Sequence, residues 1–334
     1  MPRVSVLLPA RNAAATLTVA ARSVLAEEID LELVVVDDGS TDGTAEVLQR
    51  LEAEDSRVRK VTTAGLGLVG ALRVGLSLCR ADYIARMDAD DESLPGRIRR
   101  SVEALDADSS LAAVGTGVEI FREDRPPSPN MRAYAQWLSS LTTPERLFAD
   151  RFVESPLCHP ATTLRRSMLE AVGGWEEGDF PEDWQLWLKL LAHGARLVCL
   201  PEVLFRWRDH EARLTRTANR YALHRHLWLK AHFLATTTLP VGRPIVVWGA
   251  GEVGLVLARL LRDEGVEVAR FVDVHPKKIG QRIDGVPVVA PAALDAPGEL
   301  HLVAAVGAKG ARAEIRTFLT ARGWEEGRHF TCAA

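Results

Sequence analysis

The chain has 334 residues, of which 47% are hydrophobic and 26% charged, so it has the composition of a globular protein and the length of about two domains. Its formal net charge of −4 argues against binding to nucleic acid, and no apolar run is long enough to span a bilayer. The four cysteines have no paired spacing and no signal peptide is recognisable, which favours reduced thiols and a cytoplasmic protein.

The first third of the chain alternates short apolar runs with amphipathic stretches. The runs at 4–8, 31–36, 58–62 and 83–87 predict buried strands, and apolar residues at helical spacing between them predict helices. This alternation predicts an α/β fold, because parallel strands joined by right-handed helical crossovers produce it. Further expected elements are a strand at 111–121, a surface loop at 122–130 and one long helix at 214–233.

Polar residues follow three of these predicted strands. Arg11 and Asn12 come after the first strand, Asp37 and Asp38 after the second, and the run Asp88-Ala89-Asp90-Asp91 after the fourth. Because the carboxyl ends of parallel strands meet at one edge of a sheet, we expect these side chains to converge where α/β proteins bind ligands. Crowded carboxylates suit Mg²⁺ or Mn²⁺, which prefer oxygen ligands, although acidic loops that cap a following helix are also common. The convergence, more than any single motif, predicts a nucleotide site.

Three stretches in this region resemble motifs of the family-2 glycosyltransferases. They are Val-Ser-Val-Leu-Leu-Pro-Ala-Arg-Asn, Leu-Val-Val-Val-Asp-Asp-Gly-Ser-Thr-Asp-Gly-Thr and Met-Asp-Ala-Asp-Asp, at 4–12, 33–44 and 87–91. The resemblance extends roughly from Pro2 to His210 and implies the GT-A fold, a nucleotide-sugar donor and inversion at the anomeric carbon. One departure lies near Arg73, where the family usually carries an asparagine, so the donor contact there stays open.

The resemblance also implies roles for individual residues. Asp38 resembles the carboxylate that accepts a hydrogen bond from the uracil ring, and Asp88 resembles the acid nearer the ribose. Asp90 resembles the ligand of a Mn²⁺ or Mg²⁺ ion on the diphosphate, whose negative charge such an ion neutralises. The loop that would wrap the nucleoside consists of Pro9, Ala10, Arg11 and Asn12.

Two later stretches carry further candidate residues. Glu182 and Asp183 precede helical leucines, where they could cap the helix, but the resemblance makes Asp183 the general base for the acceptor hydroxyl. Glu182 is the alternative base. The stretch Arg206-Trp207-Arg208-Asp209-His210 resembles the family's aromatic-Arg-x-His segment. This implies a phosphate contact for Arg208 and a metal or diphosphate contact for His210, with a plain surface loop as the alternative.

The C-terminal part restarts the strand–helix pattern after a threonine-rich linker. We therefore expect a GT-A glycosyltransferase domain at 1–234, a linker at 235–243 and a small Rossmann-like α/β domain at 244–334. A buried strand there leads into the turn of Gly249, Gly251 and Gly254, and Asp273 follows the next strand, as in a dinucleotide-binding fingerprint. Three alternatives stay open for this domain: it binds NAD, it binds a nucleotide-sugar, or it is a scaffold that binds neither.

The expected activity is metal-dependent transfer of a sugar from a nucleotide-sugar, with UDP as the expected nucleotide, to a glycan or lipid-linked acceptor, as in cell-surface glycan synthesis. A nucleotidyltransferase is the alternative enzyme, but it would normally carry a glycine-rich basic loop after the first strand, and Pro9 to Asn12 is not one. A non-catalytic nucleotide-sugar sensor is a third hypothesis, against which Asp88, Asp90 and Asp183 argue. Peripheral contact with the inner face of the membrane stays open.

Overall fold

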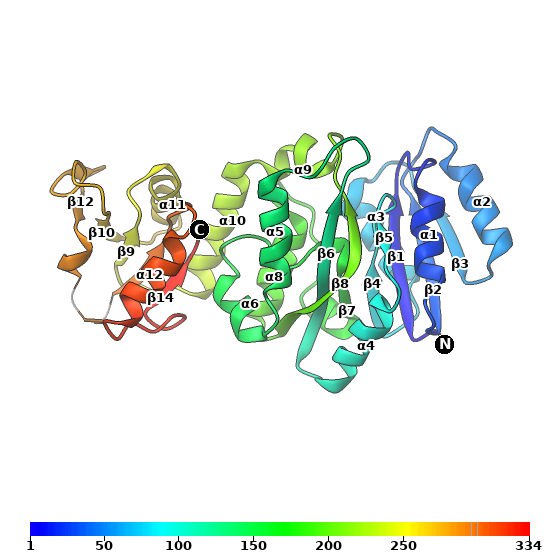
Figure 1. Ribbon diagram of the computed structural model, residues 1–334, viewed down its shortest axis with the longest axis horizontal. Coiled ribbons are helices and arrows are strands. Elements are labelled where there is room, and N and C mark those ends of the chain that lie inside the picture. The colour runs from blue at the N-terminus through cyan, green and yellow to red at the C-terminus, as the bar shows by residue number, and fades with distance from the viewer. Residues whose placement is uncertain (295, 299) are drawn as a thin grey trace. The chain divides into compact units, whose positions relative to one another are not determined.

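The computed structural model describes residues 1–294, 296–298 and 300–334, and its contacts divide the chain into two compact units (Figure 1). Unit 1 comprises residues 1–148, 156–178 and 182–217. Unit 2 comprises residues 149–155, 179–181 and 218–334. Within the described residues, no helix is both long enough and apolar enough to cross a membrane.

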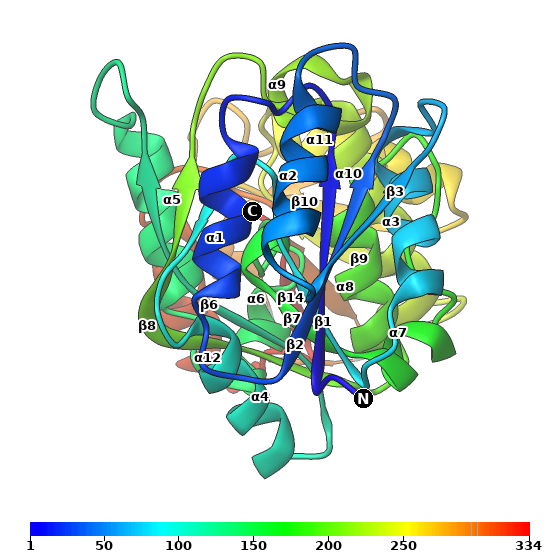
Figure 2. The same cartoon turned by 90° about the vertical axis from the view of Figure 1, so that its right-hand side faces the viewer.

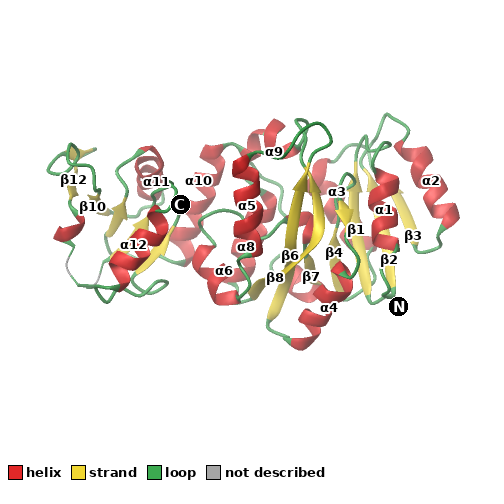
Figure 3. Ribbon diagram, viewed as in Figure 1, coloured by secondary structure: helices red, strands yellow, loops and turns green. Residues whose placement is uncertain are grey.

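Unit 1 is built on a mixed β-sheet (Figure 3). Its strands are β1 (Val4–Ala10), β2 (Leu31–Asp37), β3 (Val58–Thr62), β4 (Tyr83–Arg86), β5 (Glu92–Ser93), β6 (Leu111–Phe121), β7 (Thr163–Arg165) and β8 (Arg196–Arg208). Their order in the sheet is β3-β2-β1-β4-β7-β6-β8-β5. The first four of these run parallel, β7 is antiparallel to both its neighbours, and β5 is antiparallel to β8. The predicted α/β fold is confirmed.

Helices cover both faces of this sheet. They are α1 (Leu17–Leu25), α2 (Thr44–Glu54), α3 (Gly67–Leu78), α4 (Arg97–Ala107), α5 (Pro129–Ser139), α7 (Arg166–Ala171) and α8 (Glu182–Ala192). A further short helix, α6 (Pro144–Asp150), spans the point where the chain first passes from unit 1 into unit 2. The helices α1 and α3 lie on opposite sides of β1 (Figure 2). Val4, Val6 and Leu8 of β1 belong to one apolar core with residues of α1, α2 and α4, whereas Leu7 faces α3. Because both faces are covered, β1 is apolar on both, except for Ser5, whose hydroxyl donates to the buried carboxylate of Glu32 in β2 at 2.6 Å.

The long helix predicted at 214–233 is wrong. The structure has a short α9 (Leu214–Thr217), a 3₁₀ turn at Asn219–Tyr221 and then α10 (Leu223–Thr237). The backbone of Ala222 is extended, with a ψ of 148°, which interrupts the helical hydrogen-bond pattern. The break falls where the chain passes from unit 1 into unit 2, and α9 buries none of its residues, so the helical spacing before the break does not come from core packing.

Unit 2 contains the second α/β sheet that the sequence predicts. Its strands are β9 (Ile245–Trp248), β10 (Val268–Val272), β11 (Arg282–Ile283), β12 (Val286–Val289), β13 (His301–Ala304) and β14 (Phe330–Cys332). Their order is β11-β12-β10-β9-β13-β14, with every neighbouring pair parallel except β11 and β12. After β9 the chain adds β10 and β12 on one side of it and then crosses to add β13 and β14 on the other side. This reversal of strand order beside β9 is the kind of position at which open α/β sheets bind ligands.

Two further helices of unit 2 pack around this sheet, α11 (Glu252–Asp263) and α12 (Ala311–Thr320). α10 packs against α11, so it belongs to unit 2 although its first residues precede the linker expected at 235–243. The division into domains at 1–234 and 244–334 remains a proposal about which parts fold independently.

Candidate functional site

The carboxyl ends of β1 and β2 meet at one edge of the sheet of unit 1. Ala10 is paired with Asp37 in the register of these strands, and the N–H of Asp38 donates to the carbonyl of Ala10 at 2.8 Å. β1 includes Pro9 and Ala10, which corrects the loop expected from Pro9 onward. Pairing of β1 with β4 ends at Leu7, so β4 does not require the N–H that proline lacks.

Asp38 is buried at this edge and already holds the neighbouring turn. Its carboxylate accepts hydrogen bonds from the Thr63 hydroxyl and from the N–H groups of Leu66, at 2.6 Å, and Gly67, at 2.8 Å. The Arg11 guanidinium lies 3.9 Å away. Burial raises the pKa of Asp38, but these hydrogen bonds and the charge of Arg11 outweigh burial and hold the pKa below its usual value. Asp38 is therefore a carboxylate at neutral pH.

Asn12 and Arg11 differ in what they contact. Asn12 adopts a φ of +52°, its side-chain oxygen accepts from the N–H of Thr41 at 2.8 Å, and its own N–H donates to the Ser40 hydroxyl at 2.9 Å. Asn12 thus ties the loop after β1 to the loop after β2. The Arg11 side chain is 57% exposed at the same edge.

The three acids after β4 form the candidate metal site of unit 1. One oxygen from each of Asp88, Asp90 and Asp91 lies within 4.8 Å of the others. Asp91 is buried, one of its oxygens accepts from the N–H of Arg208 at 2.7 Å, and the other has no hydrogen-bond partner among the described residues. Burial and the charges of the two neighbouring acids raise the pKa of Asp91 well above its usual value. A divalent cation would compensate this crowded charge, and oxygen donors suit Mn²⁺ or Mg²⁺.

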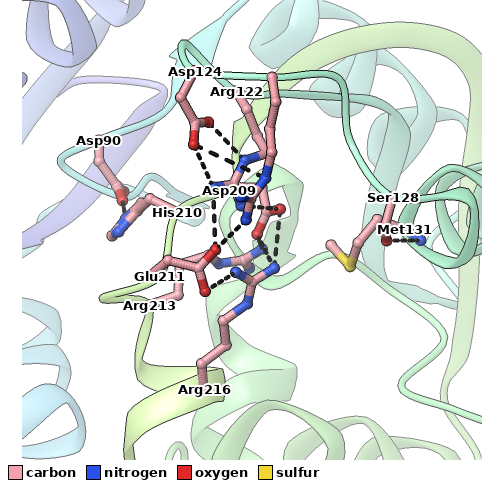
Figure 4. A network of polar contacts seen from close by, with 11 residues as sticks. Asp90, Arg122, Asp124, Ser128, Met131, Asp209, His210, Glu211, Arg213 and Arg216 are labelled. Carbon is pink, nitrogen blue, oxygen red and sulfur yellow. Dashed lines mark hydrogen bonds and ion pairs between the residues drawn. The ribbon is translucent and has the colours of Figure 1, made fainter.

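The end of β8 brings His210 and Arg208 to these acids. His210 Nε2 lies 2.8 Å from a carboxylate oxygen of Asp90 (Figure 4). Arg208 Nε donates to the backbone carbonyl of Asp90 at 2.7 Å, and its guanidinium also pairs with Glu123. The structure therefore brings the predicted residues Asp90, Arg208 and His210 together, with Arg208 engaged by protein groups.

Sequence reasoning missed a buried arginine beside the acids. The Arg86 side chain is 1% exposed and lies 2.6 Å from Asp88, so it balances part of the acidic charge. His159 accepts from the indole N–H of Trp175 at 2.9 Å, and burial lowers its pKa well below the usual value, so it is neutral. The signal for Arg86 was present: it is a charged residue inside an apolar strand, directly before the acids.

Asp183 lies in the first turn of α8, and this helix packs against β8, the strand that leads to His210. Glu182, the alternative base, is buried beside it. Trp184 and Trp187 on the same helix are fully buried, which makes them core residues rather than surfaces on which a sugar can stack.

Two of the three glycines of unit 2 are explained by packing alone. Gly249 has a φ of +121°, and a Cβ there would lie 2.8 Å from the carbonyl oxygen of Ala305. A Cβ on Gly254 would lie 1.9 Å from the carbonyl oxygen of Gly249. At Gly251, by contrast, an added Cβ would meet no described atom within 4 Å. The absence of a side chain at 251 therefore has no packing reason.

Asp273 lies beside the glycine turn, and its carboxylate already accepts three hydrogen bonds from protein groups. Its carboxylate accepts from the N–H of Ala250 at 2.9 Å, from the N–H of His275 at 2.8 Å and from Lys278 Nζ at 3.1 Å. A cavity of about 210 Å³ lies instead at the loop between β13 and α12. It is lined by Val306, Gly307, Ala308, Lys309, Gly310, Arg312 and Ala334.

Comparison with known proteins places these motifs in a family. The family model described as Glycosyl transferase family 2 matches residues 5–173. The chain is 30% identical to the putative glycosyltransferase EpsE of Bacillus subtilis over 228 residues, which cover 66% of this chain and 78% of that protein. It is also 27% identical to the O-antigen biosynthesis glycosyltransferase WbnJ of Escherichia coli over 198 residues, which cover 58% of this chain and 73% of that protein.

Two solved structures share the fold. The first is S. aureus TarS 1–349 in complex with UDP-GlcNAc, with a TM-score of 0.55 and 15% identity over 78% of this chain and 71% of that chain. The second is the mannosyltransferase PcManGT from Pyrobaculum calidifontis in complex with GDP-Man and Mn²⁺. Its TM-score is 0.51, with 20% identity over 71% of this chain and 63% of that chain. At these identities the likeness shows the fold, which is the GT-A-like mixed sheet expected from the sequence.

Proposed function

Because this chain belongs to glycosyltransferase family 2, we propose that it transfers a sugar from a nucleotide-sugar, which we take to be a UDP-sugar, to an acceptor hydroxyl with inversion at the anomeric carbon. The observation that supports this most is the gathering of Asp88, Asp90 and His210 at the edge of the sheet where Asp38 also lies. Membership of the family favours sugar transfer over nucleotidyl transfer and over a sensor without catalysis.

Asp38 and Arg11 are proposed to hold the base of the donor. A carboxylate has about four lone-pair positions, and Asp38 uses three of them on Thr63, Leu66 and Gly67. The remaining position would accept a hydrogen bond from the N–H of a uracil ring. The exposed, planar guanidinium of Arg11 can stack on the same ring. The main chain of Pro9, Ala10 and Asn12 would surround the nucleoside.

Asp90 and His210 are proposed to hold a divalent cation, Mn²⁺ or Mg²⁺, with Asp88 nearer the ribose. The residues fit such an ion, because three carboxylates crowd together and a buried oxygen of Asp91 has no partner among the described residues. When bound, the ion would supply electrostatic stabilisation of the negative charge on the departing diphosphate. The Mn²⁺ in the complex of PcManGT supports the choice of metal.

Arg208 is proposed to contact a phosphate of the donor. Its guanidinium now pairs with Glu123, whose side chain is 80% exposed. The Arg208 side chain itself is 13% exposed, and a diphosphate, which carries more negative charge than one carboxylate, would give its guanidinium a stronger partner than Glu123. The hydrogen bond from Arg208 Nε to the carbonyl of Asp90 would keep the guanidinium beside the metal ligands.

Asp183 is proposed to act as the general base. A sugar hydroxyl is a poor nucleophile, so a carboxylate must take its proton as the hydroxyl oxygen attacks the anomeric carbon. Attack on the face opposite the departing diphosphate gives inversion. The acceptor would be a glycan or a lipid-linked glycan of the cell surface, which the name of the relative WbnJ supports.

A cytoplasmic location is proposed from the cysteines. Cys79, Cys158, Cys199 and Cys332 are all buried and free, as expected in a reducing compartment. Peripheral contact with the inner face of the membrane would bring a lipid-linked acceptor within reach.

The test of the proposed donor is a screen of the full chain with Mn²⁺ and a panel of UDP- and GDP-sugars, measured as release of the nucleoside diphosphate. We expect UDP-sugars to be turned over fastest, because the one acceptor position that Asp38 keeps matches the single ring N–H of uracil, whereas guanine presents a ring N–H and an amino group side by side and needs two acceptor positions. Faster turnover of GDP-sugars would overturn the role of Asp38 at a uracil ring. No turnover of any nucleotide-sugar would overturn the proposed function.

We further propose that unit 2 binds a nucleotide, either NAD or a nucleotide-sugar, beside its glycine turn. The supporting observations are the unexplained glycine at 251 and the cavity lined by Lys309 and Arg312, both next to the switch in strand order at β9. Exposed N–H groups at the start of a helix favour phosphate, and nearby cations add to this. Asp273 keeps about one lone-pair position for a ribose hydroxyl.

The ligand of unit 2 can be identified by calorimetric titration of the full chain with NAD and with UDP-sugars in excess chelator, which removes the metal proposed for unit 1. We expect Lys309→Ala to weaken binding of the unit 2 ligand about tenfold or more, because a charge-assisted contact is lost. Lys277→Ala, an exposed lysine that does not line the cavity, is the matched control and should bind as the wild type does. Heat that Lys309→Ala leaves unchanged for every nucleotide would overturn the site at this cavity, and no heat from any nucleotide would leave unit 2 as a scaffold.

A further inference from the structure

A cluster of charged residues joins two segments that flank the candidate metal site of unit 1. We call it the ion cluster; its members are Arg122, Asp124, Arg125, Asp209, Glu211, Arg213 and Arg216 (Figure 4). The first three follow β6, and the other four follow β8. Four arginines and three acids give the cluster a formal charge of +1. None of these residues is assigned a role by the motifs of the sequence.

Asp209 and Arg122 form the buried centre of the ion cluster, with side chains 2% and 5% exposed. Arg122 Nη1 lies 3.0 Å from a carboxylate oxygen of Asp209, and Arg216 Nη2 reaches the two oxygens of the same carboxylate at 2.7 and 3.0 Å. Arg122 also makes two hydrogen bonds to Asp124, which lower the pKa of Asp124 to about 2. Both segments are thus held by ion pairs to Arg122.

The main chain of Asp209 is fixed as firmly as its side chain. Its N–H donates to the carbonyl of Phe121, the last residue of β6, at 2.8 Å. On one side in sequence, Arg208 is tied to the acids through its N–H and its Nε. On the other side, His210 lies 2.8 Å from Asp90. Three consecutive residues therefore connect the ion cluster to the acids.

We propose that Asp209 and Arg122 are positioning residues that hold His210 against Asp90 and so preform the metal site. This inference rests on the function proposed above. Neither residue need touch the ion: they fix the backbone from which His210 extends. A ligand pair that is already in place loses less conformational freedom when a cation binds, so the affinity for the cation rises.

The test is the affinity of the full chain for Mn²⁺, measured from the electron paramagnetic resonance signal of free Mn²⁺, which needs neither donor nor turnover. We expect Asp209→Asn to weaken Mn²⁺ binding about 10- to 100-fold, the range found when residues that orient metal ligands are changed. Glu211→Gln is the matched control, because it removes the same charge from the exposed rim of the ion cluster. It should change the affinity by less than about twofold, since exposed pairs contribute little.

A double-mutant cycle with His210→Ala separates positioning from a general effect of charge. If Asp209 acts through His210, then Asp209→Asn should have no further effect on Mn²⁺ affinity in the His210→Ala background. Arg122→Gln tests the same point from the other segment and should show the same loss and the same dependence on His210. It also serves as the test if Asp209→Asn does not fold, as judged by circular dichroism.

The outcomes distinguish this inference from the function on which it rests. Failure of the wild type to bind Mn²⁺ would overturn the proposed metal site and the positioning role together. If His210→Ala weakens binding but Asp209→Asn behaves as Glu211→Gln does, the metal site stands and the positioning role is wrong. Additive losses in the double variant would also contradict it, because Asp209 would then act independently of His210.

Discussion

Asp183→Asn should lower kcat by about 10²–10⁴-fold, the contribution expected of a general base, while donor affinity stays within about twofold of the wild type. Asparagine has nearly the same shape as aspartate but cannot take the proton of the acceptor hydroxyl. The measurement is a kinetic comparison with the donor and acceptor identified for the wild type, together with calorimetric binding of the nucleoside diphosphate. A collapse of donor affinity, rather than of kcat, would make Asp183 a donor-site or structural residue.

Glu182→Gln is the matched control for this prediction. Both carboxylates lie in the first turn of α8, where each interacts favourably with the positive end of the helix dipole. If that were their whole role, the two variants would retain similar kcat values, although Glu182→Gln would lose more stability, because Glu182 is 2% exposed and Asp183 is only partly buried. A large loss of kcat in Glu182→Gln with near-normal Asp183→Asn would assign the base to Glu182 instead.

The sheet of unit 1 was predictable because burial on both faces leaves a simple pattern. β1 and β2 are apolar except for Ser5, Glu32 and the terminal Asp37, polar residues follow each apolar run, and the structure buries every residue of both strands. The pattern also revealed the edge at which the candidate site lies, since parallel strands end together. The end of β1 was predicted too early, because Pro9 was expected to end the strand. β1 no longer pairs with β4 at that point, so the N–H that proline lacks is not needed there.

The contacts of individual site residues were harder to predict. The sequence suggested that the carboxylates of Asp38 and Asp273 are available to bind a ligand. In the structure, both already accept hydrogen bonds from backbone N–H groups of nearby turns. A turn that folds back onto an aspartate leaves no periodic signal. Similarly, the glycine pattern of unit 2 did not reveal that packing leaves no room for a side chain at Gly249 and Gly254. Only at Gly251 is there space for one.

Ion pairs between distant segments could not be predicted at all. Arg122 and Asp209 are 87 residues apart, and each lies in a stretch with several other charges, so the sequence favours no particular pairing. The break between α9 and α10 was missed for a related reason: apolar residues keep helical spacing across it, but the two sides belong to different units and α9 buries none of its residues. Both features depend on tertiary contacts rather than on local preference.

The second expected result concerns Asp90. Asp90→Ala should lower kcat by about 10²-fold or more, because stabilisation of the departing diphosphate by a metal ion is worth several kcal/mol. Glu103→Ala is the matched control: it removes one carboxylate from an exposed site on α4 and should leave the rate near that of the wild type. Circular dichroism of the two variants would establish that both are folded.

The most direct test of metal-dependent transfer at the acids of unit 1 is the rate of nucleoside diphosphate release as a function of Mn²⁺ concentration, for the wild type and for Asp90→Ala. We predict that the wild-type rate rises with Mn²⁺ to a plateau and is lost in excess chelator, and that Asp90→Ala stays slow at every Mn²⁺ concentration. Full wild-type activity in excess chelator, or a near-normal rate for Asp90→Ala, would contradict the account.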